Sequence, residues 1–297
     1  MFDGNNYTIS NLYINCNEIQ YVGLFGFCEG ATLQNVTISG GNVKNWNAYN
    51  PDVVGSGGLV GWANGTNIMN CKSSVDVSGV AHVGSLCGSV RSDYFPIVIQ
   101  NCSATGNVEG REGSGGLVGW LYGDVTIKNS FATGNVTMQQ QTEVNPWYVG
   151  GLVGNFMMSS AYNCYSTGSV DLNTNYTGDV IGCPYINTHI HYIYGQDIAN
   201  PKIGLIGNDC EDIADTAHFH HNGDSITLIT PVTVQGINYS NLLDALNAWV
   251  TYQNDPMLKT WVLDTITGYP VLDDFFVPSC YIARSEERRV GKESRSR

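Results

Sequence analysis

The stretch GGLVGWLYGDVTIKNSFATGNV, residues 115–136, decides the fold of this chain. It holds short apolar runs rich in Val, Ile and Thr, and Gly, Asn and Ser separate these runs. Alternating runs of this length predict β-strands, and the residues between them favour tight turns. Three strands with their turns in about 30 residues indicate one coil of a β-solenoid, which buries its inner face only by stacking on further coils.

The same motif recurs along the chain, and its central leucines are Leu24, Leu59, Leu86, Leu117 and Leu152. Degraded copies begin at residues 178 and 203. If coils stack in register about 4.8 Å apart, these leucines form an inward ladder. A second inward ladder is expected from a small position of the repeat, which holds Val36, Cys71, Cys102, Ser130 and Cys164. The asparagine before that position is expected at a corner, where stacked amides hydrogen-bond to one another; these residues are Asn35, Asn70, Asn101, Asn129 and Asn163.

The Gly-Gly-Leu-Val-Gly units, followed by Asn-Cys and Thr-Gly-Asn-Val, resemble GLUG repeats over roughly residues 1–183. This resemblance implies a right-handed parallel β-helix of the kind found in secreted and surface proteins of bacteria, including adhesin-like proteins. GLUG units carry no shared catalytic residues, so the resemblance implies architecture rather than chemistry.

The composition excludes several classes of protein. The 297 residues include 35 Gly and 30 Asn, which excludes a helical bundle or a coiled coil. No apolar stretch approaches the roughly 18 residues of a membrane span. The net charge of −13 disfavours binding to phosphate backbones, so no nucleic-acid partner is expected.

Three segments follow from these patterns. Residues 1–200 are expected to form the β-helix, and residues 201–283 a degraded last coil with a small C-terminal α+β cap. The spacing of apolar residues predicts a helix over residues 240–253 with Ser240 as its N-cap, followed by short strands near 261–264 and 268–272. Residues 284–297 are strongly basic and match the translation of a sequencing-library adapter, so we interpret them as a disordered artefact outside the fold.

The nine cysteines are an odd number, and three of them share the second ladder with Val and Ser. A position that accepts all three residue types indicates buried, reduced thiols. A disulfide between Cys71 and Cys102 on adjacent coils is geometrically permitted and remains the alternative.

No constellation for catalysis stands out. We expect no cofactor, and the sequence favours a non-enzymatic protein. A polysaccharide-active β-helix lyase or hydrolase is the alternative, and convergent carboxylates in a groove would favour it. His218, His220 and His221 are the candidates for a metal site, although exposed polarity explains them as well.

Aromatic residues give the candidate binding surface. Two insertions lie at the same position of the repeat and contain Trp46, Tyr49, Trp147 and Tyr148. Two further residues, Trp62 and Trp120, directly follow the glycine motif. Exposed rings along one face suit sugar rings or protein partners. We therefore expect an extracellular or cell-surface, adhesin-like protein that binds glycan or a host protein. We expect a monomer or part of a longer chain, because the sequence starts within the repeat pattern. The sequence shows no signal peptide.

Overall fold

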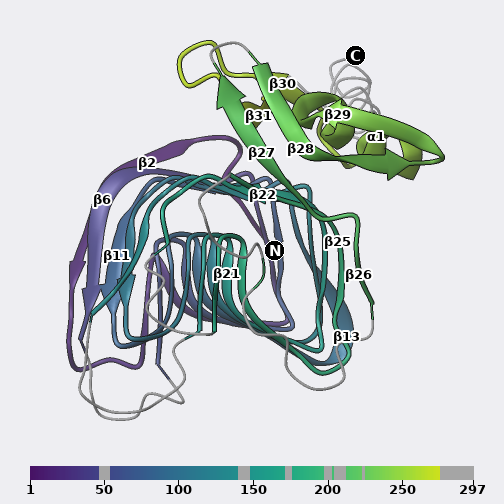
Figure 1. The fold of residues 1–297 in the computed structure, drawn as a ribbon. Coiled ribbons are helices and arrows are strands. Elements are labelled where there is room, and N and C mark those ends of the chain that lie inside the picture. Colours follow the sequence, from purple (N-terminus) through teal and green to yellow (C-terminus); the bar gives the residue numbers. More distant parts are fainter. Residues whose placement is uncertain are drawn as a thin grey trace, which may run out of the picture.

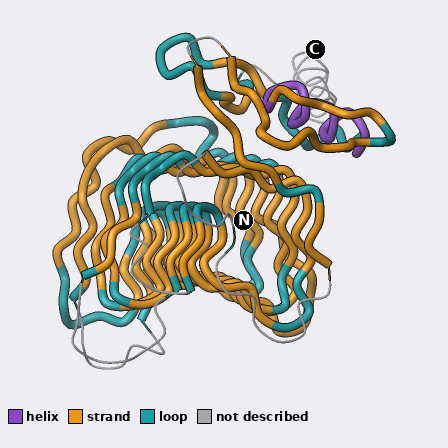
Figure 2. Tube along the Cα trace, in the orientation of Figure 1, coloured by secondary structure: helices purple, strands orange, loops and turns teal. Residues whose placement is uncertain are grey.

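The computed structural model describes residues 1–46, 54–139, 148–170, 176–196, 203, 212–222 and 225–274. Over these residues the chain is a parallel β-solenoid whose coils stack along one axis (Figure 1, Figure 2). This confirms the all-β, parallel β-helix fold expected from the repeat. The insertion loops at 47–53 and 140–147, and the whole of 275–297, lie outside the described residues.

Each coil contributes one strand to a six-stranded parallel sheet, so the solenoid has about six turns. Its strands are β3 (Tyr21–Val22), β7 (Gly55–Gly57), β12 (Ala81–Gly84), β16 (Glu112–Gly115), β20 (Val149–Gly150) and β23 (Thr177–Gly178). After a turn at the leucine of each repeat, the chain enters a 23-stranded sheet, which forms the remaining sides of the coil. Its next strands are β4 (Phe25–Glu29), β8 (Val60–Asn64), β13 (Cys87–Gln100), β17 (Val118–Lys128), β21 (Val153–Met157) and β24 (Ile181–Tyr185).

The strands that lead to the asparagine corner are β1 (Phe2–Asp3), β5 (Thr32–Gln34), β9 (Asn67–Met69), β22 (Ser160–Ser166), β25 (His189–Gln196) and β26 (Asp212–Ala214). Beyond the corner lie β2 (Thr8–Asn15), β6 (Thr37–Asn45), β10 (Lys72–Ser73), β14 (Ser103–Ala104) and β18 (Phe131–Ala132). The coil closes with β11 (Asp76–Gly79), β15 (Val108–Gly110) and β19 (Val136–Met138).

The glycines of the repeat are required because two strands of each coil pack backbone against backbone. A Cβ added to Gly115 in β16 would lie 2.1 Å from the carbonyl oxygen of Val118 in β17. One added to Gly119 would lie 2.4 Å from the amide nitrogen of Val83 in the preceding coil. No side chain fits at either position, so the motif specifies this close approach.

The leucine ladder confirms the register. Leu59, Leu86, Leu117 and Leu152 are fully buried, whereas Leu24 in the first coil is partly buried. The amide of Leu86 donates to the carbonyl of Leu117 at 3.1 Å, and the amide of Leu117 donates to that of Leu152 at 2.9 Å. The second ladder, from Val36 to Cys164, is buried as well. Like residues therefore meet along the axis, as the repeat predicts.

The asparagines form a continuous hydrogen-bonded ladder at one corner. Each Nδ2 donates to the Oδ1 of the preceding coil's asparagine, at distances of 3.2, 3.0, 2.7 and 2.9 Å from Asn70 to Asn163. All five residues have φ between 51° and 56°. Asparagine tolerates this left-handed conformation better than other residues with a side chain, so backbone and side chain both favour it here.

The C-terminal segment first extends the solenoid and then leaves it. β26 and β27 (Ala217–Asn222) pair in parallel with β25 of the last full coil. β28 (Ser225–Val234) and β29 (Ile237–Asn241) follow in antiparallel order, then α1 (Leu242–Gln253) and the hairpin of β30 (Trp261–Leu263) with β31 (Pro270–Leu272). The helix and hairpin confirm the elements expected there. Ser240 was wrong as the N-cap, because Asn241 accepts the amide of Asp244 instead.

The helix and hairpin dock on the flank of the solenoid, over the asparagine ladder (Figure 1). Asn101, Asn129 and Asn163 donate to backbone carbonyls of this segment at 2.7, 2.8 and 3.2 Å. The indole Nε1 of Trp261 donates to Asn129 Oδ1 at 2.6 Å. The side-chain amides of the ladder therefore bind neighbouring coils to one another and also bind the C-terminal segment to the solenoid. In the part of the chain that the structure describes, no helix is long and apolar enough to span a membrane.

Candidate functional site

The outer sheet formed by β6, β11, β15 and β19 carries two rows of outward side chains. Val43, Val77, Val108 and Val136 occupy one register and are buried in the core. Because strand side chains alternate between faces, their neighbours point outward. One outward row is Lys44, Ser78, Glu109 and Thr137, and the other includes Asn42, Asp76 and Asn107.

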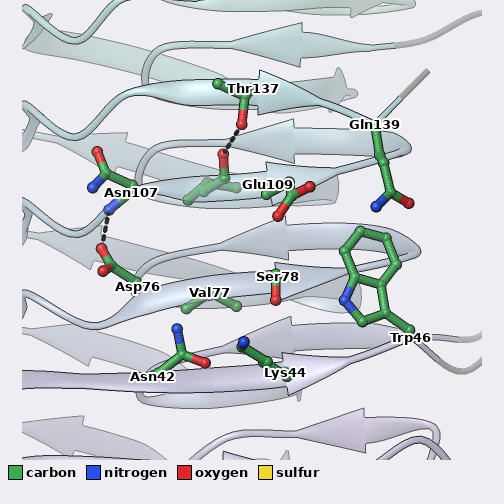
Figure 3. A pocket seen from close by; sticks show the side chains of 11 residues that line it. Asn42, Lys44, Trp46, Asp76, Val77, Ser78, Asn107, Glu109, Thr137 and Gln139 are labelled. Carbon is green, nitrogen blue, oxygen red and sulfur yellow. Dashed lines mark hydrogen bonds between the residues drawn. The ribbon is translucent and has the colours of Figure 1, made fainter.

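These rows border a surface pocket of about 330 Å³ (Figure 3). It spans four successive coils, from Asn42 and Lys44 in β6 to Thr137 in β19 and Gln139 just beyond it. Trp46 closes one side of the pocket next to the end of β6. Its lining is therefore mostly polar with one large aromatic ring, an arrangement suited to a hydroxyl-rich ligand.

Hydrogen bonds between coils fix part of this lining. The amide of Asn107 donates to Asp76 Oδ1 at 2.8 Å, and Thr137 Oγ1 donates to the carbonyl of Val108 at 3.3 Å (Figure 3). In contrast, Ser78 Oγ and Asn42 Oδ1 are buried atoms without a hydrogen-bond partner among the described residues. Buried polar atoms are normally satisfied, so these two unpaired oxygens stand out among the groups beside the pocket.

Trp46 is held in place from two directions. Its amide donates to Asn17 Oδ1 at 3.0 Å. The Arg111 guanidinium lies over the indole ring, 5.3 Å from its centroid, a favourable cation–π contact. Arg111 is in turn fixed by donating from Nε and Nη2 to Gln139 Oε1 at 3.2 and 3.0 Å. The ring is thus pre-oriented at the pocket's edge.

Trp62 and Trp120 lie elsewhere, in an aromatic seam between the six-stranded sheet and β8 and β17. Their rings are 5.8 Å apart, although two coils separate their backbones by about 9.6 Å. Ser89 pairs with Trp62 on one side and Trp120 on the other, and its small side chain lets the two rings approach each other. The His82 ring stacks on the Trp120 ring with centroids 4.7 Å apart. Trp62 is only 8% exposed, so the expectation that it presents an open ring is wrong, because its neighbours cover it.

The remaining aromatic candidates divide into two groups. Tyr148 is partly buried, contacts Tyr176 at 5.5 Å, and has its pKa raised by burial. Tyr49 and Trp147 lie outside the described residues. An exposed aromatic pair that the sequence did not indicate, Tyr94 and Phe95, projects from a bulge in β13 with 88% and 75% of its surface exposed. Neither residue of this pair lines the pocket.

The three candidate metal-binding histidines do not converge. His218 Nε2 lies 3.3 Å from Asp179 Oδ2, and His221 stacks on Tyr269 with ring centroids 4.5 Å apart. His220 alternates with His221 on β27 and is exposed. Within the described ranges, no three histidine, cysteine or acidic side chains are grouped to hold a metal ion.

The ladder cysteines are free thiols in the structure, including Cys71 and Cys102, for which a disulfide was the alternative. Burial raises the pKa of Cys102 and of Cys164 to about 12. Desolvation disfavours the thiolate, so these groups are packing elements and not nucleophiles.

Trp46, predicted from the sequence as a binding residue, lines this pocket, whereas the polar rows beside it were not predicted. The signal was present as the polar residues that flank one valine in each unit, in Asn42-Val-Lys44, Asp76-Val-Ser78, Asn107-Val-Glu109 and Asn135-Val-Thr137. Because side chains in a strand alternate between its two faces, the residues on both sides of a buried valine point to the outer face, and those of successive units lie next to each other.

Known proteins agree with the architecture. The GLUG motif matches residues 53–78, 110–137 and 145–171. Halomucin of Haloquadratum walsbyi is 32% identical over 292 residues, which are 97% of this chain and 3% of that protein. The chain thus corresponds to a small part of this relative. The crystal structure of a candidate immunoglobulin A1 protease from Bacteroides ovatus has the same fold, with a TM-score of 0.51, 17% identity, and coverage of 92% of this chain and 77% of that one.

Proposed function

Because this chain is a GLUG-repeat β-helix protein, we propose that it is an extracellular or cell-surface solenoid that binds glycan without catalysis. Its similarity to Halomucin, which its name places among the mucins, supports the location. The net charge of −13 agrees with a solvated surface that does not bind nucleic acid.

The pocket beside Trp46 is the observation that carries this proposal. An aromatic ring packs against the apolar face of a sugar, while carboxylate, amide and hydroxyl groups bind its hydroxyls. Trp46 supplies the ring, and Asp76, Asn107 and Glu109 supply the polar groups. A host protein is the other partner class considered, but a small polar pocket fits a glycan better than the flat apolar core of a protein interface.

A glycan array tests the proposal. We expect the labelled protein to bind a subset of glycans and Trp46→Ala to lose that binding. Phe95→Ala is the matched control, because it removes an exposed aromatic ring from a surface outside the pocket. Circular dichroism and thermal unfolding of each variant verify folding. An array on which no glycan binds, or on which Trp46→Ala binds like the unchanged protein, contradicts the proposal.

A hydrolase is the second candidate, because two carboxylates share this pocket. Asp76 and Glu109 are on adjacent coils, two residues apart in register, so their backbone positions are about 8 Å apart. Inverting glycosidases hold their carboxyl groups about 6.5–9.5 Å apart, a separation that side chains on backbone positions this far apart are able to reach. Release of reducing sugar from polysaccharide that is lost in Glu109→Gln and in Asp76→Asn would establish this function in place of binding alone.

A further inference from the structure

We infer that the ligand of the Trp46 pocket is an uncharged oligosaccharide of about three or more sugars that lies along the solenoid axis; this rests on the proposed glycan-binding function. The pocket's lining crosses four neighbouring strands, so a ligand along the axis would contact residues of every one of these coils. Lys44, Ser78, Glu109 and Thr137 occupy one register position in four successive coils. Three intervals of about 4.8 Å separate the first from the last, roughly 14 Å in all.

The lining repeats with the coils. Each coil presents the two residues that flank its buried valine, so equivalent polar groups recur at the strand spacing. That spacing is close to the length of one pyranose unit in an extended chain. Successive sugars of an axial oligosaccharide therefore meet successive polar pairs, whereas a single sugar reaches one or two of them.

Two oxygens beside the pocket lack a hydrogen-bond partner among the described residues. Ser78 is 8% exposed, lines the pocket, and its Oγ has no hydrogen-bond partner within the described ranges. Asn42 Oδ1 is likewise unpaired there and can only accept a hydrogen bond. Both atoms have almost no exposed surface, so a sugar hydroxyl reaches them only when these side chains turn toward the pocket, and it can then donate to either oxygen.

The charges favour an uncharged chain. Lys44 and the Arg111 that stacks on Trp46 bring two positive charges, while Asp76 and Glu109 bring two negative ones. This balance gives a uronic acid chain no net local attraction. The net charge of −13 on the whole protein repels such a polyanion.

Isothermal titration calorimetry with length series tests this inference. The probes are gluco-, manno-, xylo- and N-acetylglucosamine oligosaccharides of one to six units, with oligogalacturonides as charged counterparts. For the series that binds, we expect affinity to rise at least tenfold from the monosaccharide to the trisaccharide and then to level off. Oligogalacturonides of the same length should bind at least tenfold more weakly.

Variants at the aromatic side of the pocket and in its last coil locate the ligand. Trp46→Phe should weaken binding at every length, while Thr137→Val should weaken the trisaccharide severalfold and leave the monosaccharide unchanged. Phe95→Ala should change neither. Equal affinity for monosaccharide and hexasaccharide, or for charged and uncharged chains, overturns the inference while the glycan-binding function stands. Failure of every glycan on the array overturns the function itself.

Discussion

Removing the amide of Asn129 tests how much the corner ladder stabilises the fold. Asn129 is fully buried, and its side chain makes four hydrogen bonds. Nδ2 donates to Asn101 Oδ1 at 2.7 Å and to the carbonyl of Lys259 at 2.8 Å. Oδ1 accepts from Asn163 Nδ2 at 2.9 Å and from Trp261 Nε1 at 2.6 Å. Asn129→Gly removes all four bonds while keeping the left-handed backbone, at φ 51°, accessible.

The expected cost follows from these bonds. A net contribution of about 0.5–1.5 kcal/mol each gives roughly 2–6 kcal/mol, with a central value near 4. The buried Trp261 indole loses its partner, which places the result in the upper half of that range. Few single substitutions cost more than about 4 kcal/mol, so this one should be among the most destabilising in the chain.

Asn35→Gly is the matched control. Asn35 has the same left-handed backbone, with φ 56°, but its side chain makes two hydrogen bonds, to Asp3 at 3.0 Å and from Asn70 at 3.2 Å. It is also partly exposed, so we expect a cost of about 1 kcal/mol. The entropy that glycine adds to the unfolded chain is the same in both variants and cancels in the comparison.

Urea unfolding followed by far-UV circular dichroism measures the difference. The midpoint should fall further for Asn129→Gly than for Asn35→Gly, by an amount equivalent to about 3 kcal/mol at unchanged slope. Coincident transitions by fluorescence verify that a single free energy of unfolding applies. Costs within about 0.5 kcal/mol of each other would refute the view that the buried rungs stabilise the solenoid through their hydrogen bonds.

Three further predictions concern the rest of the chain. Trp261→Phe keeps a ring but removes the donor to Asn129, so limited proteolysis should cleave the C-terminal segment severalfold faster while the solenoid stays intact; unchanged cleavage contradicts this docking. The pKa of Cys102 is about 12, so mass spectrometry should find this thiol unlabelled by iodoacetamide at pH 8 until urea unfolds the protein, and rapid native labelling would show exposure. The pKa of Asp212 is lowered, chiefly by its hydrogen bond with His191. This contact stabilises β26 at pH values above the ordinary carboxyl pKa, and the stabilisation is lost as the pH falls through the lowered pKa. Amide hydrogen exchange of β26, corrected for the intrinsic pH dependence of exchange, should therefore be faster near pH 2.5 than at about pH 5. Equal protection at both pH values would refute this prediction.

The pocket shows where sequence reasoning reached its limit. Trp46 was predicted as a binding residue because a large aromatic residue in a polar insertion is conspicuous in sequence. Trp62 and Trp120 were equally conspicuous, yet they are packed in a seam, because the path of the chain brings His82 and a neighbouring ring over them. Exposure depends on which strands lie opposite, and a repeat pattern does not contain that information.

The repeated motif by itself determined the solenoid, the inward leucine and cysteine ladders and the asparagine corner, because each follows from a local period and from stacking like residues on like. Only the tertiary structure decided that the C-terminal helix and hairpin lie on the flank and bind the ladder amides of Asn101, Asn129 and Asn163. It also decided that polar residues from four coils share one pocket. The ladder contacts join residues 83 to 156 positions apart in the chain. Their geometry comes from the packing of whole surfaces, which no local pattern of residues specifies.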